Sequence, residues 1–294
     1  LYMRHACYAR CFGLEERMGA ENEVRISRFL ASAGVASRRH ADLLIEQGRV
    51  LVNGRRARLG EKVRPSADKV TVDGREVTAE EPRVYLALNK PPGYLSTCSD
   101  PFSRRTVLSL VRGVKERVFP VGRLGQDADG LLLLTNDGEL SYLLTHPKHH
   151  VIKEYVVEVI GDRDERKVKE MLSGIIIDGR KVSADYAEFL PLKGPRERLR
   201  IGVHEGEKHL VKKMCAWAGY GVYRLTRTKV GRVSLGDLPM GKWRHLTPAE
   251  VKALYDEAMA GKDGTRGKAS PNHDAKRRPE NPAQGANPGR GARR

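Results

Sequence analysis

The sequence predicts an α+β protein of two domains: a small domain of helices and hairpins, then a larger domain around a mainly antiparallel, mixed sheet. Beyond about residue 84, strand-like runs outnumber the scattered helical ones. Near the N-terminus, Asn53-Gly54 and Asp73-Gly74 each interrupt a β-branched run, and such pairs are the strongest short signals of a hairpin. A chain of 294 residues is long enough to bury the cores of two ordinary domains.

The small domain is expected over residues 24–80, and it begins with two short helices. Ser27 is expected to cap the first helix, "RFLASA", and Gly34 to follow its end. Ser37 is expected to cap the second helix, "RRHADLLIEQ", which Gly48 ends. The β segments "RVLVNGR" and "KVTVDGREV" then carry the two hairpin signals.

Arginines gather at the helix starts and turns of this domain, with few acidic residues between them. Such a run is often only a solvated surface, but its density here predicts a face that binds phosphates. The stretch "VRISRFLASAGVASRRHADLLIEQGRVLVNGRRARLG" resembles the S4 RNA-binding domain, an αL-type module. The resemblance implies an anchor for structured RNA that recognises backbone shape. The expected RNA-binding residues here are Arg25, Arg28, Arg38, Arg39, Arg49, Arg55, Arg56 and Arg58.

Residues 81–84 are expected to form a linker, because Pro82 interrupts any continuing strand, and the second domain is expected over 85–258. An apolar strand opens that domain, and Pro91-Pro92-Gly93 forces a turn directly after it. Further strands are expected within 117–122, 131–136, 154–161, 186–192, 198–206 and 222–236. Helical periodicity marks 139–147, 164–174, 207–219 and 247–261.

The charge of the chain points to an anionic partner. A formal net charge of +17 and a pI near 9.9 favour nucleic acid, although a merely basic soluble protein has the same totals. No apolar run is long enough to span a bilayer, and no nucleotide-binding glycine motif is present, so neither a membrane nor a cofactor is expected. Four irregularly spaced cysteines predict a reducing, cytoplasmic setting without disulfides or a metal site. A monomer is expected.

Both ends of the chain lack a patterned core. Residues 1–23 are expected to be a poorly ordered extension, and 1–17 read as an over-long start assignment. The tail, 259–294, carries nine Lys/Arg against three Asp/Glu and has no apolar face, which predicts disorder. An auxiliary tether for nucleic acid is the second interpretation of the tail.

The second domain resembles the pseudouridine synthases of the RsuA/RluB type, which modify ribosomal RNA. Four blocks carry the resemblance, in order: "LNKPPGYLST", "VGRLGQDADGLLLLTNDGEL", "KEYVVEVIG" and "EGEKHLVKKMCAWAGYGVYRLTRTKVGRVSLGDLPMGKWRHLT". The resemblance implies isomerisation of a uridine in folded RNA to pseudouridine, without a metal or organic cofactor. It also places Arg123, within the second block, among the RNA-binding residues.

The implied chemistry detaches uracil at N1 and rejoins it through C5, which requires a carboxylate near the sugar or base. Tyr155 matches the family's base-stacking tyrosine, and its alternative is an ordinary residue of an amphipathic strand. Lys212 matches the cation that pairs with the catalytic aspartate and keeps it ionised. A solvated helix lysine is the alternative for Lys212, and Lys213 is its rival.

The family's aspartate is missing from its position. Its motif reads G-R-L-D, and the blocks align here with Gly125 in place of the aspartate. Asp127 lies two residues later, Asp129 occupies a variable position, and Asp137 is interpreted as a hairpin residue. The family's usual Gln is also replaced, by Leu210.

Three hypotheses follow from this departure. In the first, Asp127 takes over as the catalytic carboxylate and Gly125 gives the loop the freedom to reshape. In the second, the protein binds RNA in ribosome assembly without isomerase activity, because catalytic groups need close positioning. In the third, the glycine is a sequencing variant of an ordinary synthase.

Overall fold

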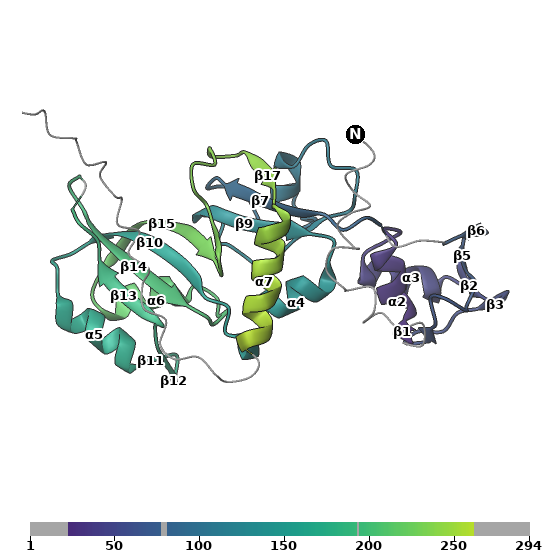
Figure 1. Ribbon diagram of the computed structural model, residues 1–294, viewed down its shortest axis with the longest axis horizontal. Coiled ribbons are helices and arrows are strands. Elements are labelled where there is room, and N and C mark those ends of the chain that lie inside the picture. The colour runs from purple at the N-terminus through teal and green to yellow at the C-terminus, as the bar shows by residue number, and fades with distance from the viewer. Residues whose placement is uncertain (1–22, 78–80, 193, 262–294) are drawn as a thin grey trace, which may run out of the picture.

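The small N-terminal domain is a helix pair beside short antiparallel strands. A computed structural model describes residues 23–77, 81–192 and 194–261, and Figure 1 shows the small domain in purple and blue beside the larger one. Strands β3, β2, β5 and β6 form one sheet in that order, and β1 pairs with β4. The elements are β1 (Val24–Arg25), α2 (Ile26–Ser32), α3 (Arg38–Glu46), β2 (Val50–Val52), β3 (Arg55–Arg56), β4 (Lys62–Val63), β5 (Val70–Val72) and β6 (Arg75–Glu76).

Most of the capping and turn residues of this domain have the roles that the sequence predicts. The Ser37 side chain accepts from the His40 N–H at 3.2 Å and caps α3. Both expected turns have two residues at positive φ, including Asn53 at 49° and Gly54 at 82°, as a type I′ hairpin requires. The prediction for Ser27 is wrong: α2 begins at Ile26, so Ser27 lies inside the helix and is buried. The short strand β1 runs directly into α2, so its last residue, Arg25, occupies the N-cap position, and no side chain caps the helix there.

The larger domain is built on a nine-stranded sheet with the central order β13-β14-β10-β15-β9-β7-β17, to which β16 and β8 add at β15 and β9. All its pairings among the described residues are antiparallel except β15 with β9. This confirms the α+β class and the mainly antiparallel, mixed sheet. Its strands are β7 (Tyr85–Lys90), β8 (Phe119–Pro120), β9 (Asp129–Thr135), β10 (Lys153–Ile160), β13 (Tyr186–Phe189), β14 (Glu197–Val203), β15 (Gly221–Val230), β16 (Val233–Ser234) and β17 (Trp243–His245).

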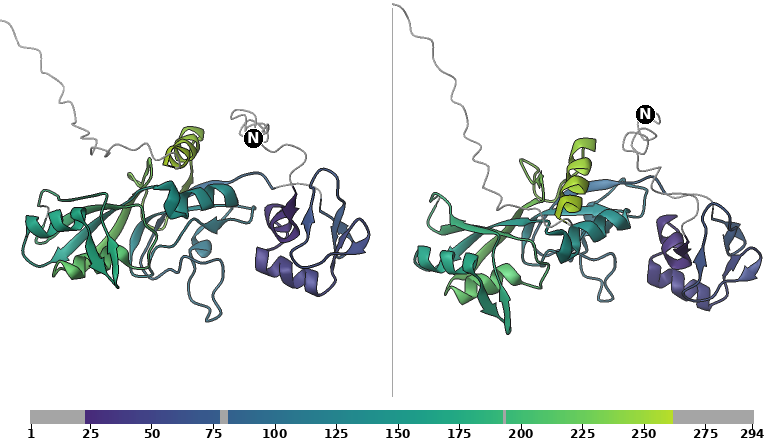
Figure 2. Two further views of the ribbon diagram at one scale, coloured as in Figure 1. Left: turned by 90° about the horizontal axis from the view of Figure 1, so that it is seen from below. Right: turned by 60° about the horizontal axis from the view of Figure 1, so that its bottom comes forward.

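Helices cover the two faces of this sheet. They are α4 (Gly138–Thr145), α5 (Glu165–Ser173), α6 (Leu210–Trp217) and α7 (Pro248–Ala260), with short 3-10 turns η3 (Val107–Leu110) and η4 (Pro147–His149). Figure 2 shows the yellow-green α7 on one side of the sheet and the green α6 on the opposite side. A separate hairpin, β11 (Ile175–Ile177) with β12 (Arg180–Val182), follows α5.

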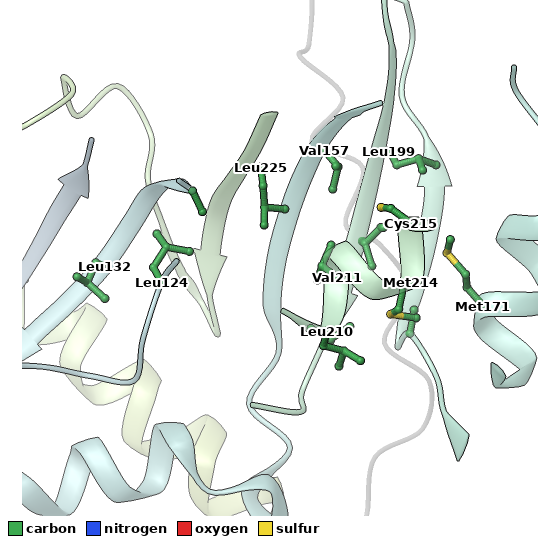
Figure 3. Packing of buried hydrophobic residues seen from close by; sticks show 14 of the residues in the cluster. Leu124, Leu132, Val157, Met171, Leu199, Leu210, Val211, Met214, Cys215 and Leu225 are labelled. Carbon is green, nitrogen blue, oxygen red and sulfur yellow. The ribbon is translucent and has the colours of Figure 1, made fainter. Parts of the chain in front are cut away.

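The run of four leucines is the central strand β9, buried on both faces. Leu131 and Leu133 belong to the cluster that contains the apolar residues of α4 and α7. Leu132 and Leu134 belong to the second cluster, with the apolar residues of α5 and α6. Alternate side chains of a strand point to opposite faces, so a continuous apolar run fits a strand covered on both sides. In Figure 3 the α6 residues Leu210, Val211, Met214 and Cys215 face Val157 and Leu225 of the sheet.

Several features differ from the expectations. Asp137 is the N-cap of α4, where its carboxylate accepts from the Glu139 and Leu140 N–H groups, so the hairpin interpretation is wrong. The helix that it starts needs a capping acceptor, and a following glycine alone does not signal a hairpin. The hairpin β11–β12 and strand β17 were not expected. Helix α7 matches the helical periodicity expected over 247–261 and ends at Ala260. The expected extension up to residue 22 and the tail beyond 261 lie outside the described residues.

Candidate active site

A cleft of about 1230 Å³ lies where three segments of the fold meet. They are the turn after β7, the loop between β8 and β9, and the start of α6. Strands β10 and β15 contribute further lining residues. This volume exceeds that of an ordinary small-ligand pocket and suits one nucleotide together with its neighbours. The sequence-predicted residues that line it are Arg123, Gly125, Asp127, Tyr155 and Lys212.

Lys90, at the end of β7, holds the loop between β8 and β9. Its side chain is fully buried, and its ammonium donates to the backbone carbonyls of Pro91 at 3.0 Å, Gln126 at 3.3 Å and Ala128 at 2.7 Å. Burial lowers the pKa of this lysine to about 8, against the opposing effect of Asp129 and Asp127. A buried ammonium needs such acceptors, so Lys90 fixes the path of the loop backbone.

The loop turns back on itself between Gly125 and Ala128, where the Ala128 N–H donates to the Gly125 carbonyl at 3.2 Å. This turn directs the Asp127 side chain toward position 125. A Cβ built on Gly125 would lie 3.0 Å from Asp127 Oδ1, so the Asp127 carboxylate lies beside the place where a side chain at position 125 would begin. The Asp127 carboxylate therefore lies close to position 125, although the two residues are two positions apart in the chain.

Lys212, on the first turn of α6, donates to the Asp127 carboxylate. This hydrogen bond and the charge of the ammonium lower the pKa of Asp127 below its ordinary value, and partial burial acts in the opposite direction. The rival Lys213 pairs instead with Asp178 and, at 3.6 Å, with Glu207. The structure thus brings Lys212, and not Lys213, to the loop carboxylate.

Tyr155 lies on β10 and lines the cleft, half-buried. Its partner in register on β15 is Arg227, which also lines the cleft and is 4% exposed. The Arg227 guanidinium donates through Nε to the Leu131 carbonyl at 2.7 Å. Lys153, two residues before Tyr155, donates to the His204 carbonyl at 2.8 Å, and burial followed by the charge of Arg227 lowers its pKa to about 8. The wall around the tyrosine is therefore cationic, as an RNA site requires.

The remaining acidic residues of the block have structural partners. Asp129 is 3% exposed and accepts from Arg224 Nε at 2.7 Å, which joins β9 to β15. Asp137, besides capping α4, accepts from the hydroxyl of Tyr85 at 2.9 Å and from that of Tyr255. Neither residue lines the cleft. Asp127 is the only carboxylate of this loop and strand that both lines the cleft and contacts Lys212, within the described residues.

The eight small-domain arginines that are expected to bind RNA are exposed, and two of them are held by acids. Arg49 makes a bidentate pair with Asp73, at 2.8 and 2.5 Å. Arg55 makes one with Glu61, at 2.6 and 3.3 Å. The other six are exposed on α2, α3, their neighbouring turns and the β3 hairpin: Arg25, Arg28, Arg38, Arg39, Arg56 and Arg58. Arg123 is exposed at the rim of the cleft.

Sequence reasoning missed Lys90, Lys153 and Arg227, the three buried Lys/Arg residues at or beside the cleft among the described residues. A lysine that ends an apolar strand before Pro-Pro-Gly is the one signal that pointed to Lys90. In the part of the chain that the structure describes, no group of three His, Cys, Asp or Glu side chains is placed to hold a metal ion. No helix there is long and apolar enough to cross a membrane.

Two family models match the chain. The model described as RNA pseudouridylate synthase matches residues 84–217, and the S4 domain model matches 24–69. The two matches lie in the larger and the small domain of the structure, respectively.

The match to this chain covers nearly the whole length of several similar proteins. An uncharacterized RNA pseudouridine synthase of Aquifex aeolicus is 44% identical, over 79% of this chain and 94% of that protein. The ribosomal large subunit pseudouridine synthase B of Bacillus subtilis is 38% identical, over 81% and 98%. The dual-specificity RNA pseudouridine synthase RluF of Escherichia coli is 35% identical, over 88% of each.

A solved structure shares the fold. The crystal structure of a pseudouridylate synthase has 31% sequence identity and a TM-score of 0.56, and it matches 79% of this chain and 99% of that one. The S4 domain, the four sequence blocks and the cleft that they build agree with these matches. The chain belongs to the RNA pseudouridine synthases that carry an N-terminal S4 domain.

Proposed function

We propose that this protein converts one uridine of ribosomal RNA to pseudouridine, with Asp127 as the reacting carboxylate. The substrate class is supported by the relatives in Bacillus subtilis and Escherichia coli, whose names specify the large ribosomal subunit and a dual RNA specificity. The exposed arginines of the small domain supply the positive surface that folded RNA requires.

The reaction breaks the bond between uracil N1 and ribose C1′, turns the base, and joins C5 to C1′. N1 gains a proton and C5 loses one, so the overall step is an isomerisation. A carboxylate starts it, either as a nucleophile or as a base. Lys212 lowers the pKa of Asp127 and so favours its ionised form further, and Tyr155 offers a ring on which the flipped uracil stacks.

One observation carries this assignment. The Asp127 carboxylate lies beside the position where a side chain of residue 125 would begin, and it contacts Lys212 there. Catalysis depends on where the reacting oxygens lie and on the cation that keeps them ionised. The turn at 125–128 brings the Asp127 oxygens to the cleft from a different position in the chain, and Lys212 of α6 supplies the cation.

Pseudouridine mapping of ribosomal RNA tests the reaction itself. A strain that lacks the protein is expected to lose the modification at one site, and the wild-type gene is expected to restore it. Unchanged ribosomal RNA in the deletion strain, with RNA affinity intact in the purified protein, would instead support an RNA-binding assembly factor without isomerase activity.

Two variants test the carboxylate. Asp127→Asn is expected to abolish turnover while leaving RNA affinity nearly unchanged, because the side chain keeps its size and Lys212 adds a cation to the cleft. The double variant Gly125→Asp/Asp127→Asn returns a carboxylate to the same region and is expected to recover turnover. Both are measured as single-turnover tritium release from RNA that is labelled at uracil C5.

The exchange variant is feasible because position 125 has no positive φ, so an aspartate fits its backbone. Turnover by Asp127→Asn at the wild-type rate would exclude Asp127 as the reacting group. Asp137→Asn is the control for removing an acid from the same block, since Asp137 lies outside the cleft; it is expected to lower stability and to leave kcat of the folded protein unchanged.

Several features of the organisation belong to the same proposal. We assign RNA binding to residues 24–80, a linker to 81–84 and catalysis to 85–258. A cytoplasmic monomer without a metal or cofactor fits this assignment, because the ribosome is the substrate and the proposed groups all come from one chain. Gel filtration with light scattering measures the oligomeric state.

A further inference from the structure

One wall of the cleft ends in a loop, residues 97–106, that projects from the larger domain. Its base is closed where the Leu95 N–H donates to the Arg105 carbonyl and the Val107 N–H donates to the Leu95 carbonyl, both at 2.9 Å. Thr97, Ser99, Asp100 and Arg104 of this loop line the cleft. Figure 2 shows it in blue, projecting away from α7 in both views.

Asp100 braces the loop from inside. Its carboxylate accepts from the Phe102 N–H at 3.0 Å and the Arg104 N–H at 3.1 Å, and it makes a bidentate pair with the Arg104 guanidinium at 3.1 and 2.6 Å. The side chain of Asp100 is only 5% exposed, although the loop is on the surface. Arg104 lowers the pKa of Asp100 to about 2, so the brace stays ionised at every working pH.

This bracing presents an aromatic ring to solvent. Phe102 is 76% exposed, the largest exposed fraction among the large hydrophobic residues that the structure describes. The Arg104 guanidinium lies 5.2 Å from the centre of the Phe102 ring. The loop thus holds a phenylalanine ring in water, beside a cation and between two residues that line the cleft, Asp100 and Arg104.

We propose that Phe102 is a stacking site for an unpaired base of the RNA, next to the uridine that enters the cleft. This inference rests on the proposed function, because the target uridine must leave its stack and so exposes the faces of its neighbours. Phe102 covers one of those faces. It is a positioning residue and does not touch the reacting atoms.

The local charge favours RNA over a protein as the occupant. Residues 97–106 hold two arginines, Arg104 and Arg105, against the single acid Asp100, whose charge Arg104 neutralises. Arg123 lies at the rim of the same cleft. Aromatic rings that alternate with arginines bind single-stranded RNA by stacking and by phosphate contacts, with little dependence on base identity.

The experiment measures affinity and turnover separately for Phe102→Ala, Phe102→Trp and Phe102→Leu. The RNA is the ribosomal fragment that contains the mapped uridine. Phe102→Ala is expected to raise Kd by about ten-fold, with kcat at saturating RNA close to wild type. Phe102→Trp is expected to restore affinity. Full recovery with Phe102→Leu would overturn stacking, since a leucine offers contact area without an aromatic face.

Single abasic nucleotides then locate the contact. We expect one abasic position beside the target to weaken binding of the wild-type protein about ten-fold and to have no further effect on Phe102→Ala, because both changes remove the same stack. Additive losses at every flanking position would overturn the proposal. Ile160→Ala is the control, because Ile160 is 59% exposed but lies at the far end of β10 from Tyr155; it is expected to leave both parameters unchanged.

The outcomes separate this inference from the proposed reaction. If the mapped uridine is modified but Asp127→Asn turns over at the wild-type rate, the proposed carboxylate fails, while the affinity and abasic measurements still test the stack. If turnover is normal and Phe102→Ala binds like the wild type, only the stacking site is rejected. Thermal unfolding checks each variant, and because the ring makes few contacts, the transition temperature is expected to stay constant.

Discussion

At the scale of single residues, two buried or half-buried lysines organise the cleft in different ways. Lys212 neutralises the Asp127 carboxylate directly. Lys90 acts on the backbone. It donates to the carbonyls of Gln126 and Ala128, on both sides of Asp127, and to the carbonyl of Pro91, next to itself in the chain. Removal of Lys90 would leave these carbonyls without their donor and release the turn.

Lys90→Met is therefore expected to lower kcat strongly, as measured in the tritium-release assay. It also changes how stability depends on pH. The folded pKa of Lys90, about 8, is below its ordinary value of 10.5, so between these values the folded protein binds fewer protons than the unfolded chain. This group makes the free energy of unfolding rise with pH across that window, and below it the full cost of burying the charge remains.

Urea unfolding at pH values near both ends of the window measures the effect. The wild-type free energy of unfolding is expected to increase relative to that of Lys90→Met as the pH rises from about 8 toward about 10.5. If the difference between the free energies of unfolding of the two proteins did not change with pH, it would contradict the assigned pKa of Lys90. Lys115→Met, at an exposed position, serves as the control for loss of a lysine.

At the scale of elements, the parallel pairing of β9 with β15 joins the two halves of the sheet at the cleft. In this pairing Gly130 lies opposite Arg227. Gly130 has φ +102°, and a Cβ built there would overlap the Arg227 carbonyl oxygen and lie 2.8 Å from its backbone nitrogen. A side chain at this position cannot fit without separating the strands.

Gly130→Ala is expected to destabilise the protein by about 3 kcal/mol or more, since backbone strain and overlap add. Gly179→Ala provides the matched control. Gly179 also has positive φ, at +74°, but a Cβ there would meet no atom within 4 Å, so only the strain remains, about 1 kcal/mol. If urea unfolding gave the same loss of unfolding free energy for both variants, it would show that β9 and β15 separate at this point without a cost in free energy.

At the scale of the whole molecule, the charge of +17 is expected to make RNA binding strongly salt-dependent. The arginines do not contribute equally. Arg39 is exposed on α3, whereas Arg49 is already paired with Asp73. Arg39→Ala is expected to reduce the slope of log K against log salt by about 1, and Arg49→Ala by less. A slope that is unchanged in Arg39→Ala would remove α3 from the RNA interface.

Much of this molecule was predictable from its sequence. The α+β class followed from strand runs with scattered helices, and the hairpins followed from Asn-Gly and Asp-Gly. The placement of the Asp127 oxygens did not follow, because it depends on how Lys90 holds the carbonyls of Gln126 and Ala128, in a loop more than thirty residues away in sequence. Ser27 and Asp137 were misassigned because a capping residue is defined by its neighbours in space as well as by its type.

The turn between Gly125 and Ala128 has a consequence for how activity is inferred from alignments. In a sequence alignment, this chain has Gly125 in the column where the family has its acid. On that basis alone it would be classified as a catalytically inactive homologue. The folded loop offers a carboxylate at nearly the same point in space. On the proposed assignment, the reacting acid is identified by its place beside Lys212 in the cleft, although it stands two positions away from the family's aspartate in the chain.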